Sequence, residues 1–190
     1  GRTVLISGCI DTQKVHISSA IGSGYKYMLI VTSDEAKARK MCDDASFFNK
    51  EAIYYPAKDA IFYSADVHGN QITGERLRCI SRIINHSRTG EEVLTVVTTM
   101  DGIADRLIPV ERFKEAVITL DYSSEIEPEK LAKKLVAMGF VRTGMVEDKG
   151  QFAIRGGIID IFSYTDEAPV RIELWDTEVD SIRMFDVESQ

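Results

Sequence analysis

Two groups of residues in the sequence have types and spacing that could do chemistry. Gly8 and Lys14 stand at the first glycine and the lysine of the phosphate-loop pattern G-x-x-x-x-G-K-[ST]. In such a loop, backbone N–H groups and the lysine hold the phosphates of a nucleotide. The second group is Arg155, Arg171 and Trp175, whose guanidinium and indole groups are the types most enriched where proteins bind one another.

The phosphate-loop pattern is degenerate at its other two positions. Gln13 replaces the second glycine, and its Cβ obstructs the close approach of the backbone to phosphate. Val15 replaces the serine or threonine whose hydroxyl binds Mg²⁺, and Asp11 adds a carboxylate inside the loop. We therefore predict that residues 8–15 are a vestigial loop that binds no nucleotide and no metal. Weak nucleotide binding through Lys14 is the alternative.

The second group depends on the alternation of side chains along strands. A strand over residues 170–175 places Arg171 and Trp175 on the face opposite its apolar side chains. One strand earlier, Arg155 points outward by the same alternation. These residues are therefore candidates for a protein-binding patch. The alternative is that Trp175 packs under the turn at residues 166–169 and that both arginines only pair with carboxylates on adjacent strands.

No catalytic constellation is evident in the sequence. The three histidines fall in separate predicted elements, and no nucleophile elbow or H-E-x-x-H motif occurs. His68 lies in a loop predicted over residues 56–71, where a solvated histidine is the favoured interpretation and a site residue the alternative. The three cysteines are odd in number and lack a C-x-x-C pair, which argues against a disulfide framework and a structural zinc site.

The elements that would position these residues change in character along the chain. Over residues 1–112, β-rich runs alternate with helical stretches, which predicts an α/β layer containing a partial P-loop-type parallel sheet. Over residues 113–190, one helix precedes closely spaced strands, which predicts a smaller, β-rich α+β domain. Strands are expected at 3–7, 27–33, 52–55, 92–98, 141–146, 152–162, 170–175 and 179–185, and helices at 14–21, 34–48, 72–84 and 128–138.

The charge is distributed unevenly over the 190 residues. Residues 1–112 hold 14 Lys+Arg and 14 Asp+Glu, whereas residues 113–190 hold 9 and 16, so the formal net charge of −7 comes from the second part. An acidic part repels phosphates, which disfavours direct DNA binding there. No apolar run approaches the roughly 20 residues of a membrane span, and no secretory signal opens the sequence, so we expect a cytoplasmic protein.

Three strand blocks carry a family resemblance. Residues 150–162, 169–175 and 178–186 resemble, in order and spacing, the UvrA-binding domain shared by bacterial UvrB and the transcription-repair coupling factor (Mfd) family. Residues 74–77 and 93–103 are also similar to that family. The degenerate phosphate loop, and an interval too short for the DNA-gripping hairpin of UvrB, favour the Mfd family.

The resemblance implies an adaptor rather than an enzyme. In the Mfd family this UvrB-like module has no ATPase activity and recruits UvrA to lesion-stalled RNA polymerase for nucleotide excision repair. Its UvrA-contacting positions, two arginines and an aromatic, fall on Arg155, Arg171 and Trp175. ATP, Mg²⁺, RNA polymerase and double-stranded DNA belong to other domains of the full-length family member, whose carboxy-terminal domain also covers the UvrA-binding surface. The alternative is a UvrB-type, nucleotide-dependent helicase fragment that binds damaged DNA.

Overall fold

The structure is a computed structural model that describes residues 3–49, 51–58, 67–89 and 92–188. Its residues group into two compact units. The first contains Gly1–Tyr63 and Glu75–Leu107, and the second contains Ser64–Gly74 and Ile108–Gln190. The domain boundary between residues 112 and 113 stays a prediction.

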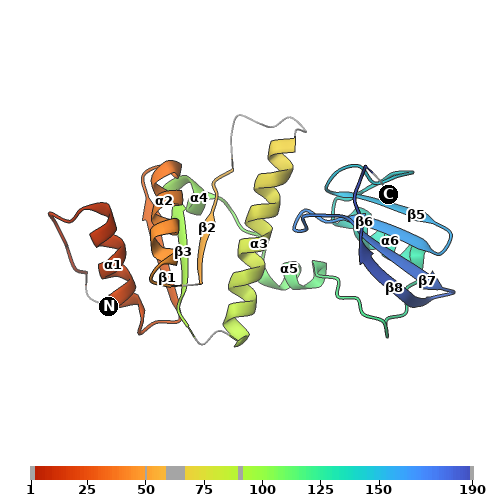
Figure 1. Cartoon of the computed structure of the whole chain (residues 1–190), viewed down its shortest axis with the longest axis horizontal. Coiled ribbons are helices and arrows are strands. Elements are labelled where there is room, and N and C mark those ends of the chain that lie inside the picture. Colours follow the sequence, from red (N-terminus) through yellow and green to blue (C-terminus); the bar gives the residue numbers. More distant parts are fainter. Residues whose placement is uncertain (1–2, 50, 59–66, 90–91, 189–190) are drawn as a thin grey trace. The chain divides into compact units, whose positions relative to one another are not determined.

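A parallel sheet forms the centre of the first unit (Figure 1). Its three strands are β1 (Tyr27–Thr32), β2 (Ala52–Tyr55) and β3 (Leu94–Thr99), in the spatial order β1-β3-β2. Both outer strands run parallel to β3, so the connections between them must cross over the sheet. The alternation of β-rich and helical segments therefore predicted the parallel arrangement correctly.

Helices of the first unit lie on both sides of this sheet (Figure 1). They are α1 (Asp11–Gly22), α2 (Glu35–Ser46), α3 (Val67–Thr89), which the division into units splits at Gly74, and the short α4 (Met100–Ala104). Asp34, the first residue of the helix predicted over 34–48, caps α2, because its carboxylate accepts a hydrogen bond of 2.8 Å from the backbone N–H of Lys37. Apolar side chains of α1, α2 and β3 share one buried cluster, which includes Val15, Met41 and Val97.

Two predictions for the first unit are wrong. Residues 3–7 form no strand: Val4 and Leu5 are exposed, and the described residues supply no neighbouring strand to pair with them. The loop predicted over residues 56–71 ends early, because α3 begins at Val67 and includes His68. Residues 59–66 of that loop lie outside the described residues.

A five-stranded sheet forms the second unit, in the order β4-β5-β6-β7-β8. Neighbouring strands pair antiparallel except β4 and β5, which are parallel. Helix α6 (Pro128–Ala137) follows the short α5 (Val110–Ala116), which the sequence patterns did not indicate. The strands are β4 (Val141–Arg142), β5 (Gln151–Arg155), β6 (Ile158–Phe162), β7 (Val170–Trp175) and β8 (Glu178–Met184).

One face of this sheet packs against α6. Phe152, Ile159 and Ile172 lie on that face and are at most 2% exposed, and they share a cluster with Leu131 and Leu135 of the helix. Burying each such side chain contributes about 1.5–3 kcal/mol. Because successive residues of a strand point to opposite faces, this packing leaves the other residues of β5, β6 and β7 on the second face of the sheet.

The helices of the described ranges include none that is both long and apolar enough to cross a lipid bilayer.

Candidate protein-binding face

Two adjacent turns bring Arg155 and Trp175 to the same end of the second sheet. Arg155 ends β5 before a turn at Gly156, whose φ of +60° suits glycine. Trp175 ends β7 before a turn at Asp176, which has a φ of 59°. The backbone N–H of the residue preceding Trp175 donates a 2.8 Å hydrogen bond to the carbonyl of Gly157, so the two turns are neighbours.

A buried carboxylate joins the two predicted arginines on the second face of the sheet. Asp160 of β6 lies opposite Arg171 of β7 and is 1% exposed. Its Oδ1 accepts a 2.7 Å hydrogen bond from Arg171 Nε, and its Oδ2 accepts one of 2.9 Å from Arg171 Nη2. Arg155 Nη2 donates to the same Oδ2 at 2.6 Å. The expected pairing of both arginines with a carboxylate on a neighbouring strand therefore exists.

The two arginines differ in exposure. The side chain of Arg171 is 12% exposed, and its guanidinium lies 4.5 Å from the centre of the Phe185 ring. Hydrogen bonds to Asp160 raise the pKa of Arg171 above its ordinary value. The Arg155 side chain is 40% exposed and donates one hydrogen bond to Asp160. Arg171 is thus held by the sheet, whereas Arg155 also reaches solvent.

Trp175 is an exposed aromatic side chain. It is 79% exposed, which contradicts the alternative in which it packs under the turn at residues 166–169. Tryptophan is among the residue types most enriched at the hot spots of protein interfaces. The alternation along β7 therefore placed Trp175 correctly in solvent.

A second ion pair lies beside the first on this face. Glu173 of β7 accepts a 2.6 Å hydrogen bond from Arg183 Nη2 and one of 3.0 Å from the Ser181 hydroxyl. The cross-strand pairing places Arg183 directly opposite Arg171. We use the name polar strip for the side chains on this face, which has three guanidinium groups and two carboxylates: Arg155, Asp160, Arg171, Glu173 and Arg183.

Asp160 and Arg183 were not identified from the sequence. Asp160 sits inside an apolar strand, where its neighbours Ile159 and Ile161 suggest core rather than a charged network. The alternation along β6 does place Asp160 on the face away from the core. Its contact with Arg171 depends on the register of β6 and β7, which the sequence does not reveal.

The degenerate phosphate loop has a different geometry from the predicted one. Helix α1 begins at Asp11, before the lysine, and no strand precedes it among the described residues. The Gln13 side chain accepts a 3.2 Å hydrogen bond from the backbone N–H of Ile10. Lys14 Nζ contacts Asp11 Oδ1 at 2.9 Å, and this pairing lowers the pKa of Asp11. In the first turn of α1, Gln13 and Lys14 therefore bond to groups of the same turn. In a nucleotide-binding loop, the corresponding residues would hold phosphate.

Val15 and Gly8 are the two remaining residues of the degenerate phosphate loop. Val15 is fully buried among residues of α2 and β3, so a hydroxyl at this position would face the core. Gly8 has a φ of +79° and forms the turn before α1. The parallel sheet of the predicted fold is thus confirmed, whereas its partial P-loop-type detail is not, because no strand precedes α1 among the described residues.

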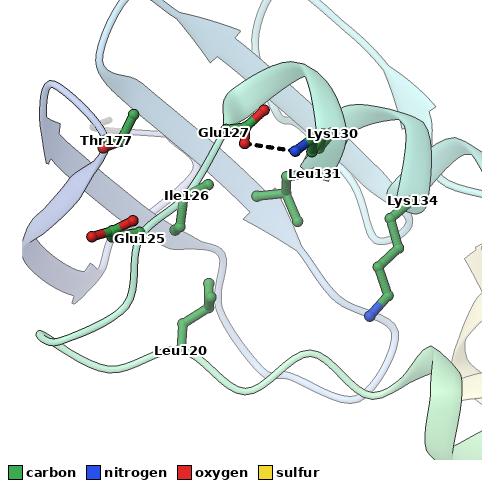
Figure 2. A pocket seen from close by; sticks show the side chains of 8 residues that line it. All are labelled: Leu120, Glu125, Ile126, Glu127, Lys130, Leu131, Lys134 and Thr177. Atoms are coloured by element: carbon green, nitrogen blue, oxygen red, sulfur yellow. Dashed lines mark hydrogen bonds and ion pairs between the residues drawn. The ribbon is translucent and has the colours of Figure 1, made fainter.

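A shallow pocket lies elsewhere in the second unit, between α6 and the segment that precedes it (Figure 2). Its volume is 560 Å³, and Leu120, Ile126 and Leu131 supply its apolar lining. The ion pair of Lys130 and Glu127, 2.6 Å long, lies on its rim. Its lining contains no histidine or cysteine, the described residues include no cluster of metal ligands, and none of the residues singled out in the sequence lines the pocket.

Known proteins are similar to this chain over nearly its whole length. Residues 118–190 match the family model of the UvrB interaction domain. Over 98% of its length the chain is 36% identical to the transcription-repair-coupling factor of Bacillus subtilis and 35% identical to that of Staphylococcus aureus. Identity to the Staphylococcus haemolyticus factor is 34% over the whole chain. The chain spans 16% of the length of each of these relatives.

Proposed function

From the UvrB interaction domain at residues 118–190 and the similarity of the whole chain to transcription-repair-coupling factors, we propose that these residues are the N-terminal adaptor module of such a factor. The module recruits UvrA to RNA polymerase stalled at a lesion, which begins nucleotide excision repair. The observation that carries this proposal is the exposed Trp175 beside Arg155 at one end of the polar strip.

Each residue of the proposed UvrA-binding face has a separate part in binding. Trp175 supplies apolar contact area, because its indole is already free of intramolecular cover. Arg155 supplies a partly exposed cation with donors beyond the single one used by Asp160. Arg171 lies flat against Phe185 and Asp160 and forms the floor of the face.

The first unit is proposed to bind no nucleotide and to have no ATPase activity. Three features support this: Asp11 places a carboxylate 2.9 Å from Lys14 where phosphate would bind, the Gln13 side chain accepts a hydrogen bond from the backbone N–H of Ile10, and Val15 lies in the core. A working phosphate loop needs free backbone N–H groups, an available lysine and a hydroxyl for Mg²⁺. We propose that the longer protein binds RNA polymerase and double-stranded DNA through its other domains. Its carboxy-terminal domain is proposed to contact this module within the same chain.

Binding of purified UvrA to the 190-residue chain, measured by isothermal titration calorimetry, tests the proposal. We expect Trp175→Ala and Arg155→Ala each to weaken binding by about 2 kcal/mol, because hot-spot residues contribute at least this much. Matched controls in the same unit are Tyr122→Ala, which removes another exposed aromatic, and Arg142→Ala, which removes another exposed guanidinium. Unchanged affinity in both test variants, with circular dichroism showing intact folds, would reject the proposed face.

A further inference from the structure

We infer that Asp160 is a positioning residue of the UvrA-binding face: its carboxylate fixes the guanidinium of Arg155 in the orientation that binds. This inference rests on the proposed function and adds to it a residue that contacts no partner itself. The starting observation is that one carboxylate, 1% exposed, accepts three hydrogen bonds from two arginines.

The two arginines use this carboxylate differently. Arg171 binds both oxygens, in a two-pronged arrangement that admits only one relative orientation of the groups. Arg171 is also held from the other side by the Phe185 ring. The carboxylate is therefore itself fixed by Arg171, and its position is set before any partner arrives.

Arg155 uses the remaining capacity of the same carboxylate. Its Nη2 reaches Oδ2 at 2.6 Å from the last position of β5, next to the glycine turn. A free arginine side chain at such a position loses rotamer entropy when a partner fixes it. Because Asp160 already restricts Arg155, part of that entropy is lost on folding rather than on binding.

Stability alone gives a weak reason for this arrangement. A buried ion pair is often no more stabilising than well-packed apolar residues of the same volume. Asp160 is 1% exposed and lies opposite the buried Ala153, so an apolar residue at position 160 would also be buried. A charged group that orients a partly exposed arginine is useful to binding, which accounts for its position on this face.

A double-mutant cycle with purified UvrA tests this role. The variants are Asp160→Asn, Arg155→Ala and the double variant, each first checked for an intact fold by circular dichroism. We expect about a tenfold loss of affinity for Asp160→Asn, about a 30-fold loss for Arg155→Ala, and a loss for the double variant that stays near 30-fold. A side chain with a purely structural role gives independent losses, which would multiply to about 300-fold.

A second background keeps the inference testable if Asp160→Asn alone does not fold. Combining Asp160→Asn with Arg171→Gln replaces the buried ion pair by two amides that can bond to each other. In this background we expect Arg155→Ala to cost less than about threefold in affinity. An equal cost of Arg155→Ala with and without Asp160 overturns the positioning role and leaves the proposed function intact. If the unmodified chain does not bind UvrA, the proposed function fails and the inference with it.

Discussion

The start of α1 and the polar strip of the second unit both hold cations beside carboxylates, but they differ in solvation. Asp11 is 41% exposed and Lys14 is 47% exposed, so water screens their contact. Asp160 is 1% exposed and its partner Arg171 is 12% exposed. An exposed pair can open at little cost in free energy to receive another ligand. Opening a buried pair is costly, because it leaves a buried carboxylate without a partner.

This difference shows what a sequence motif leaves undetermined. The phosphate-loop pattern correctly predicts a helix that contains Lys14, yet the helix begins early, at Asp11, and Lys14 contacts that residue one turn away. The polar strip has no sequence motif of its own, yet four strands bring its charges together in two neighbouring groups of ion pairs. The chemistry of each region therefore depends on which carboxylate pairs with the cation and on whether the ion pair is exposed to water.

The largest expected effect that tests the difference between the exposed and the buried ion pairs is on the stability of the second unit. We expect Arg171→Ala to lower the free energy of unfolding by about 3 kcal/mol, because Asp160 then keeps a single, partly exposed partner. Chemical denaturation followed by circular dichroism measures the loss. The control Arg142→Ala, which breaks an exposed pair with Glu129, is expected to cost less than about 1 kcal/mol. A similarly small loss for Arg171→Ala would mean that the two pairs do not differ as described.

A smaller effect is expected from restoring the phosphate-loop residues. Val15→Thr places a hydroxyl in the buried cluster of the first unit and is expected to lower the free energy of unfolding by about 1–2 kcal/mol. Combined with Gln13→Gly, it completes the sequence pattern but leaves the Asp11 carboxylate in the loop and no strand before α1 among the described residues. We therefore expect no ATP binding by equilibrium dialysis. Micromolar binding that Lys14→Ala removes would show that the first unit retains a nucleotide site.

The last effect is absent at neutral pH and grows only in alkaline solution; it concerns the first unit, which contains every cysteine of the chain. Burial raises the pKa of Cys42 to about 11 and that of Cys79 to about 12. Below the unfolded pKa, near 9, both states keep the thiols protonated and stability is complete. Above it the unfolded thiols ionise first, so the free energy of unfolding should fall from pH 9 to 11.

Denaturation at pH 8, 9 and 10 measures this dependence. The double variant Cys42→Ala/Cys79→Ala is the control, and its decline over this range should be shallower than that of the unmodified chain. An equal decline of the free energy of unfolding in both chains would show that the buried thiols of the first unit do not cause its dependence on pH.

Local patterns predicted most of the fold. The cap at Asp34, the helix at α6 and the strand at β7 follow from side-chain types within a few residues of each other. Residues 3–7 have a strand-like composition, but a strand also needs a neighbour to pair with, and composition carries no information about that. Asp160 was missed for a related reason, since its partners come from two other strands.

The exposed Trp175 has a practical consequence, because it is the only tryptophan of the chain. No other indole contributes to the intrinsic fluorescence of the module, so its emission comes from a side chain that water already surrounds. Unfolding changes that environment little, whereas covering the indole with another protein moves its emission toward the blue and protects it from aqueous quenchers. The chain thus carries a built-in optical reporter at the place where its partner is proposed to dock.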